Sequence, residues 1–268
     1  MVRHTVTEAA RLGMKVDLPP GSGWKMGGDF LEENQGAAKI TFENNSVCIE
    51  PSGEKIKRPG PGGGGLALNP FDKTSLQKVT DHFTPAFGNL GIRAQFHDSW
   101  EYGANARLDL MEVFEQRFGY PLEDHLPDGT LPPRVRYDLQ FLLSELALNE
   151  FILPWNEWCH QLGHLSRNQA HGSPGNLLDL YGACDIPETE VFTSIKPDTP
   201  LLSKFASSAA HVMGKTLVSS ETGTWLKEHF QVTLADLKQL CDNLFVSGIN
   251  HHVYHGTAYS PQDAPWPG

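Results

Sequence analysis

The sequence predicts an α/β fold of the (β/α)8 TIM-type barrel class, with about six core strands present. Short polar or acidic motifs follow apolar or β-branched runs at five places, and the segments between these motifs are long enough to hold helices. A barrel whose active site collects side chains from the carboxyl ends of parallel strands produces this alternation. The five motifs cover residues 96–101, 169–172, 185–190, 219–222 and 250–256.

Runs rich in β-branched residues predict the strands, while 3.6-residue periodicity and capping signals predict the helices between them. Thr74 is the expected N-cap of the second helix, and Pro154 is expected to kink or divide the longest one. Because only six strands are counted, the barrel is expected to be truncated at both ends. The expected strands are 14–18, 92–97, 165–170, 184–190, 216–220 and 248–254, and the expected helices are 5–12, 74–87, 108–118, 134–162, 176–181, 204–214, 225–230 and 234–245.

An insertion at about residues 38–66 separates the first two expected strands. Two β-rich runs flank Asn44, Asn45 and Ser46, which predicts a β-hairpin inserted in a βα loop. The stretch 59–65 is rich in glycine but lacks the Lys-Ser/Thr of a phosphate-binding loop, so a flexible surface loop is expected there. With this insertion, residues 1–268 are expected to form a single (β/α) barrel catalytic domain fragment.

Composition excludes several classes of function. The net charge of −11 disfavours nucleic acid and anionic membrane surfaces as partners. No apolar run approaches the ~20 residues needed to span a bilayer, and the first residues show no signal-peptide pattern. Localisation is left open, with a secreted or periplasmic parent chain as one alternative. The four cysteines are isolated from one another, so core thiols are expected rather than disulfides or a structural zinc site.

Glu101 and Glu190 form the first candidate catalytic pair, because each follows an expected strand. Cleavage of a glycosidic bond needs one carboxyl group to protonate the leaving oxygen and a second carboxylate to activate water or attack the sugar. Asp185, Glu188 and Glu221 compete for the same roles. Glu188 and Glu190 are two residues apart, so they face the same way on an extended strand.

Candidate substrate-binding residues surround these carboxylates in the motifs. Aromatic rings beside polar groups suit the apolar face of a sugar, although half-buried amphipathic side chains are the alternative interpretation. Glu221 either binds sugar hydroxyl groups or lies at a helix start, where the helix dipole favours a carboxylate. The candidates are Trp24, Asp98, Trp100, His171, Glu188, Glu221, His252 and His255.

The histidines support a second hypothesis, a metal-dependent barrel hydrolase. His97, His171, His251, His252 and His255 all lie near the ends of expected strands. The sequence has no H-x-H on an early strand and no H-E-x-x-H motif, and no metal ligands are assigned. A third hypothesis is a carbohydrate-binding fragment or pseudoenzyme without catalytic activity.

Several motifs taken together resemble the α-L-rhamnosidases of glycoside hydrolase family 106. They are Asp98-Ser-Trp-Glu101, residues 117–120, 126–127 and 155–163, and the run Asp185-Ile-Pro-Glu-Thr-Glu190. Residues 13–28 resemble the family's early strand and turn, and residues 254–268 resemble its closing segment. The stretch 169–172 departs from the Glu-Pro-Tyr-Gly type of sequence expected in many members.

The resemblance implies an inverting, calcium-assisted exo-hydrolase on a (β/α)8 barrel that belongs to a longer multidomain chain. It implies Glu101 as the general acid, Glu190 as the general base and a rhamnose-containing carbohydrate as the substrate. For an inverting mechanism the two carboxyl groups are expected to lie about 6.5–9.5 Å apart across one cleft. Calcium is expected only by this resemblance.

Overall fold

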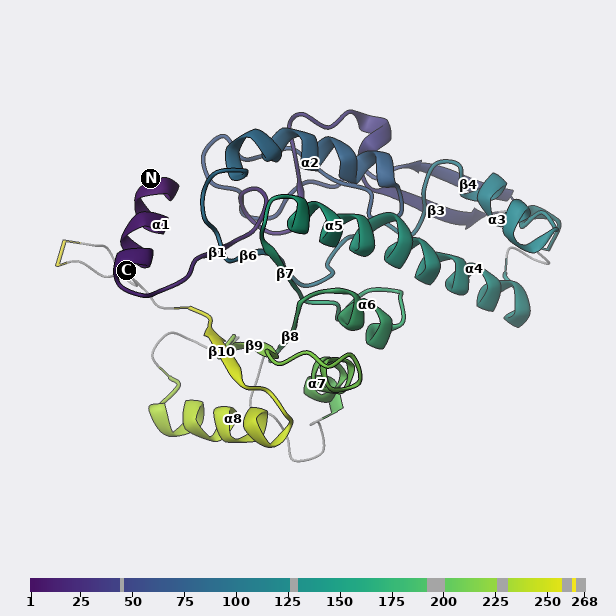
Figure 1. The fold of residues 1–268 in the computed structure, drawn as a ribbon. Helices are drawn as coiled ribbons and strands as arrows, with labels where there is room; N and C mark the ends of the chain where they lie inside the picture. Colours follow the sequence, from purple (N-terminus) through teal and green to yellow (C-terminus); the bar gives the residue numbers. More distant parts are fainter. Residues whose placement is uncertain (44–45, 126–129, 192–200, 226–230, 257–261, 264–268) are drawn as a thin grey trace.

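A six-stranded parallel sheet lies at the centre of the protein, whose computed structural model describes residues 1–43, 46–125, 130–191, 201–225, 231–256 and 262–263. The strand order is β1-β6-β7-β8-β9-β10 (Figure 1). Every pairing in this sheet is parallel and each strand overlaps a predicted one, although β9 begins and ends later than the predicted 216–220, so the predicted parallel arrangement is confirmed. The strands are β1 (Asp17–Leu18), β6 (Ala94–His97), β7 (Leu165–Asn168), β8 (Ile186–Glu190), β9 (Ser219–Thr222) and β10 (His251–Tyr254).

The sheet curls, so that side chains of distant strands meet on its inner face. His251 of β10 lies within electrostatic reach of Asp17 on β1 and of Arg167 on β7, although two strands, β8 and β9, separate β10 from β7 in the sheet. In the described part of the chain β1 and β10 remain the two edges. The observed architecture is therefore a curled half-barrel of the α/β class.

Helices connect successive strands and cover the outer face of the sheet (Figure 1). Asp72, rather than the predicted Thr74, is the N-cap of α2, because its side chain accepts a hydrogen bond from the Thr74 N–H at 2.9 Å. The helices are α1 (Val2–Arg11), α2 (Lys73–Phe87), α3 (Leu110–Phe118), α4 (Pro133–Leu146), α5 (Leu153–Gln161), α6 (Leu177–Ala183), α7 (Leu201–Val212) and α8 (Leu234–Val246), with 3-10 turns η1 (Glu33–Gln35) and η2 (Glu123–His125).

The long predicted helix is divided by a π-helical segment, η4 (Ala147–Ile152), which joins α4 to α5. The irregularity expected at Pro154 takes this form, since proline has no N–H for the α-helical pattern and follows directly after the π-helical turns. The segment turns Phe151 into the core, where its ring packs against the ring of His97 with centroids 5.0 Å apart. The π-helix thus packs against the end of β6.

The insertion and the segment before it contain four short strands, and the insertion contacts the loop that follows β6 through a bridge between Ala38 and Ala106. The predicted hairpin is present as β3 (Ala38–Glu43) and β4 (Ser46–Pro51), which pair antiparallel. β2 (Gly27–Gly28) pairs antiparallel with β5 (Leu66–Ala67) and closes the insertion at its base. Gly65 is required there, because a Cβ atom on it would lie 2.0 Å from the carbonyl carbon of Gly28.

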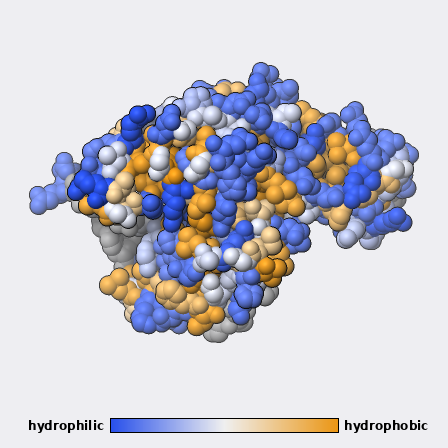
Figure 2. All heavy atoms as spheres, in the orientation of Figure 1, coloured by the Kyte–Doolittle hydropathy of each residue, from blue (hydrophilic) through white to orange (hydrophobic). Residues whose placement is uncertain are grey.

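Figure 2 shows a mainly hydrophilic face on which apolar residues are interspersed. Among the described helices none is long and apolar enough to cross a membrane. Most of the helix predicted at 225–230, the hairpin turn at 44–45 and most of the closing segment at 257–268 lie outside the described residues.

Candidate active site

The inner face of the curled sheet carries a buried ionic group, here named the floor cluster: Asp17, Arg93, Arg167, Glu188 and Ser219. Arg93 Nε donates to Asp17 Oδ1 at 2.7 Å, and Arg167 Nη1 donates to Asp17 Oδ2 at 2.6 Å. Arg167 Nε also pairs with Glu188 Oε2 at 3.0 Å, and the Ser219 hydroxyl donates to the same oxygen at 2.6 Å. The floor cluster fills the interior of the half-barrel with mutually paired charges.

A second group lies nearer the carboxyl ends of the strands, here named the mouth cluster: Asp98, His171, Glu190, Glu221 and His255. His171 Nε2 lies 3.0 Å from Glu190 Oε2, and His255 Nδ1 lies 2.6 Å from Glu221 Oε1. Register explains their meeting, since Glu190 of β8 is paired with Glu221 of β9. Carboxylate–histidine pairs from neighbouring strands are therefore side by side, as expected of a catalytic face.

Gln169 joins the mouth cluster to the floor cluster. Its Nε2 donates to Glu221 Oε2 at 2.8 Å and to Glu188 Oε1 at 3.0 Å. The Thr224 hydroxyl donates to the other oxygen of Glu221 at 2.9 Å. Glu221 is thus held by an amide, a hydroxyl and a histidine, and its side chain is only 12% exposed.

The carboxylates of the mouth cluster act on one another electrostatically. Burial raises the pKa of Glu190, the charges of Glu221 and Asp98 raise it further, and His171 offsets part of the rise. Burial also raises the pKa of Asp98; the Ser99 N–H lowers it in part and the charge of Glu221 raises it. A carboxyl group that keeps its proton longer than usual is suited to general acid work or to sharing a proton with a neighbour.

Glu101 has a different environment, in the loop that follows β6. Its Oε2 accepts a hydrogen bond from Trp24 Nε1 at 2.8 Å and forms an ion pair with Lys57. Burial alone would raise the pKa of Glu101, but these partners and the charge of Lys25 lower it overall. The pKa of Glu101 is therefore held below its ordinary value, whereas the pKa of Glu190 is held above it.

The side chains of two predicted sugar-binding residues point away from the mouth cluster. Trp100 is 5% exposed and packs against the rings of Phe71 and Phe151, so in this structure it is a core residue. His252 points away from the inner face, since its Nδ1 lies 3.0 Å from the Thr222 hydroxyl and its ring packs on Phe245 of α8.

The remaining predicted sugar-binding residues lie in three different places. Glu188 is fully buried in the floor cluster, beneath the mouth. Asp98, His171, Glu221 and His255 are together in the mouth cluster, while Trp24 contacts Glu101. Their contacts with a sugar and the predicted distance between the catalytic carboxyl groups stay predictions.

The histidines of the metal hypothesis do not converge on one point. His97 is fully enclosed on the outer side of β6, where Nδ1 lies 2.7 Å from Asn168 Oδ1, and burial lowers its pKa to about 4. His251 lies beside the floor cluster and His252 faces α8. Within the described ranges, no group of three or more His, Cys, Asp or Glu is arranged to hold a metal ion.

Some functional contacts were not predicted from the sequence. Gln169 stands in a recognised motif, and its position two residues before His171 on an extended segment could have placed both on the inner face. Lys57 carried no such signal, because it reaches Glu101 across 44 residues from inside the insertion.

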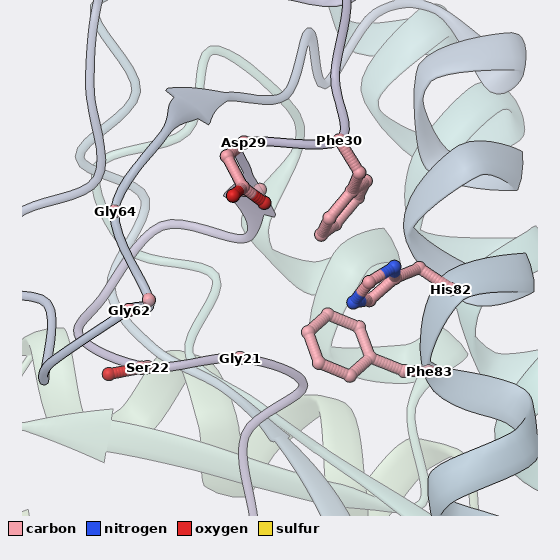
Figure 3. A pocket seen from close by; sticks show the side chains of 11 residues that line it. Gly21, Ser22, Asp29, Phe30, Gly62, Gly64, His82 and Phe83 are labelled. Carbon is pink, nitrogen blue, oxygen red and sulfur yellow. The ribbon is translucent and has the colours of Figure 1, made fainter.

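A separate cavity of about 250 Å³ lies between the insertion and α2 (Figure 3). Glycine-rich turns form one wall, and the opposite wall carries Phe30, His82 and Phe83, with the first two rings stacked at 3.9 Å. Gly21 and Ser22, from the loop after β1, belong to the glycine wall. The same loop therefore borders this cavity and supplies Trp24 to Glu101.

A curled parallel sheet with carboxylates and histidines gathered at its strand ends defines a barrel-like hydrolase domain. A family model described as alpha-L-rhamnosidase, glycoside hydrolase family 106, matches residues 66–268, and the chain belongs to this family. The resemblance noted from the motifs is thereby confirmed.

Known proteins similar to this chain are much longer than it. A protein named putative beta-glucuronidase from Formosa agariphila is 27% identical over 238 residues, which cover 80% of this chain and 20% of that protein. The solved structure of a rhamnosidase from Novosphingobium sp. PP1Y matches with a TM-score of 0.68 and 26% identity, covering 81% of this chain and 23% of the other. The chain thus spans about a fifth of the length of these relatives.

Proposed function

We propose that this chain is the catalytic part of an α-L-rhamnosidase that removes terminal α-L-rhamnose from a glycoside or polysaccharide. One observation carries the proposal beyond family membership: Asp98, Glu190 and Glu221 come from three different strand ends, and the charge of Glu221 raises the pKa of both Asp98 and Glu190. Glycosidases need carboxyl groups in unequal protonation states around one bond. Glu190 of the mouth cluster, with a raised pKa, and Glu101, with a lowered pKa, are the two groups that the proposal uses.

In the proposed mechanism Glu101 is the general acid and Glu190 is the general base of an inverting hydrolysis. Glu190 would take a proton from the attacking water while Glu101 protonates the departing oxygen, so the product sugar has the opposite anomeric configuration. The complete chain would close the half-barrel to eight strands.

The pKa directions favour a second assignment within the same function, in which the two roles are exchanged. Glu190 has the raised pKa that a general acid requires, and Glu101 has the lowered pKa of an ionised base. The leaving-group experiment described in the Discussion separates the two assignments.

Calcium belongs to the proposal through the family resemblance alone. Carboxylates of the mouth cluster are of the ligand type that calcium prefers, and a bound cation would neutralise their mutual repulsion. No ligand set is assigned, and none of the proposed steps depends on the ion.

The experiment is hydrolysis of matched aryl α-L-rhamnosides and aryl β-D-glucuronides by the full-length protein, with product configuration followed by NMR from the first turnover. We expect release from the rhamnoside, with the inverted anomer appearing first and mutarotating afterwards. Glu190→Gln serves as the inactive control for contaminating activity. Preferential cleavage of the glucuronide would overturn the substrate assignment, and sugar binding without hydrolysis of either would favour the non-catalytic alternative.

A further inference from the structure

Glu101 is held by a part of the chain that precedes the segment matched by the family model. Trp24 and Lys57 are joined as an antiparallel bridge, with backbone N–H···O distances of 3.2 and 3.3 Å in the two directions. Both side chains reach the same oxygen of Glu101, Oε2. Glu101 lies within residues 66–268, whereas both of its partners lie outside that range.

Further contacts join the same two segments. The Tyr102 hydroxyl accepts a hydrogen bond from the Met26 N–H at 3.0 Å. Glu54 accepts one from the Gly103 N–H at 2.8 Å and forms an ion pair with the buried Lys25. Residues 24–26 are thus linked, directly or through Glu54, to residues 101–103.

The backbone at Lys25 indicates that this arrangement is held firmly. Lys25 has a φ of 69°, a left-handed conformation that residues with a side chain rarely adopt. Such conformations persist only where surrounding contacts determine them. Here the ion pair of Lys25 with Glu54 and the neighbouring contacts of Trp24 and Met26 hold the backbone in this conformation.

We propose that Lys57 and Trp24 are positioning residues that set both the orientation and the ionisation of Glu101. Because both donors engage Oε2, a proton carried by Glu101 occupies Oε1, which fixes the oxygen that exchanges a proton with the reacting groups. The proposal rests on the proposed role of Glu101 as one of the two catalytic carboxyl groups, and it applies whether Glu101 is the acid or the base.

The surrounding charges make Lys57 the main electrostatic partner of Glu101. Lys25 also acts on Glu101, but its ammonium group is paired with Glu54. Asp98 and Glu221 act on Glu190. The side chains of Lys57 and Glu101 are 47% and 34% exposed, so water weakens their interaction and a moderate effect is expected.

The first test compares pH profiles of kcat/KM for aryl α-L-rhamnosides in the full-length protein and its Lys57→Met and Trp24→Phe variants. The limb of the profile that belongs to Glu101 should move to higher pH by about one unit in Lys57→Met, since the carboxylate loses its cation. Trp24→Phe should move it less and lower kcat more than it changes KM. Lys57→Arg keeps the charge and should restore the position of the limb.

Lys55→Met is the matched control, because Lys55 lies on the same segment and is exposed, and its removal changes the net charge equally. Its profile should coincide with that of the unaltered protein. An equal shift in Lys55→Met, or an unmoved limb in Lys57→Met, would overturn the proposal. Circular dichroism establishes that each variant is folded.

A second measurement separates this proposal from the proposed function. Infrared titration of the carboxyl groups, with Glu101→Gln used to assign the band of Glu101, reports its ionisation without any turnover. Lys57→Met should shift this band's titration to higher pH even if the protein hydrolyses no glycoside. If the titration of Glu101 shifts in Lys57→Met but the protein hydrolyses no glycoside, only the proposed rhamnosidase function is rejected. If the protein hydrolyses the rhamnoside but the titration of Glu101 does not shift, the role of Lys57 is rejected.

Discussion

Glu101 and Glu190 are chemically identical side chains whose different environments shift their pKa values in opposite directions. Glu101 meets an ammonium group and an indole N–H, while Glu190 meets two carboxylates and a single histidine. A pair of carboxyl groups pushed apart in pKa is the usual basis for dividing acid and base roles. Mutation of each residue therefore tests the division directly.

We expect Glu101→Gln to depress turnover most for rhamnosides with poor leaving groups, because an activated aryl group departs with little protonation. Glu190→Gln should reduce turnover of all substrates by a similar factor, about 10²–10⁴, since water must be activated whatever group departs. Added azide should restore part of the rate of Glu190→Gln. The measurement is kcat and KM across aryl rhamnosides of graded leaving-group pKa. The exchanged assignment predicts the opposite pattern, with the leaving-group dependence in Glu190→Gln.

Glu221 is the third carboxylate whose substitution is compared with those of Glu101 and Glu190. Its carboxylate is held by Gln169, Thr224 and His255, and if it mainly binds sugar hydroxyl groups, Glu221→Gln should raise KM more than it lowers kcat. A loss of kcat as large as that of Glu101→Gln, with Glu190→Gln near the unaltered protein, would move the base to Glu221.

At the scale of elements, the sequence predicted the positions of the strands better than the environments of the side chains at their ends. Alternating patterns and terminal motifs located all six strands, and period-two alternation correctly put Glu188 and Glu190 on one face. That pattern could not distinguish the buried floor from the open mouth, because both positions face inward. For a related reason it could not show that the rings of Trp100 and His252 turn to the helical side, where Phe151 and Phe245 pack against them.

The floor cluster predicts a specific dependence of stability on pH. Burial would raise the pKa of Asp17, but Arg93 and Arg167 lower it overall. A carboxyl group with a lowered folded-state pKa contributes stability above its unfolded pKa, near 3.8, and loses that contribution as the pH falls through the lower folded value. The wild-type protein should therefore lose the contribution of Asp17 only in strong acid.

We expect Asp17→Asn to lower the free energy of unfolding by about 3–5 kcal/mol at neutral pH, because it leaves two arginines without their shared partner. The difference from the wild type should shrink below the ordinary pKa of aspartate. Asp242→Asn removes an exposed i,i+4 pair with Lys238 and should cost less than about 0.5 kcal/mol. Urea unfolding at several pH values measures both. Equal effects of the two substitutions would show that the floor cluster is not the stabilising element.

For the whole molecule, the order of strands and helices and the family followed from the sequence, whereas the contacts of the insertion did not. Lys57 and Glu54 reach the loop after β6 from residues whose local pattern shows only a hairpin and a turn. Such contacts depend on how the insertion packs against the loop after β6. The residue pattern within one segment cannot predict this packing. The family model matches the segment that contains Glu101 but not Trp24 and Lys57, the partners of its carboxyl group.

The open sheet leads to the last prediction, which concerns association. β1 and β10 are the edges of the described sheet, and unpaired strand edges readily pair with other chains. We expect the isolated 268-residue chain to form dimers or larger species, and a longer chain that includes the flanking strands of a closed barrel to show less association per mole. Size-exclusion chromatography with light scattering, over a range of concentrations, measures this. A stable monomer of the isolated chain at all concentrations would show that the sheet edges are protected without further strands, and the proposed closure to eight strands would lose its physical basis.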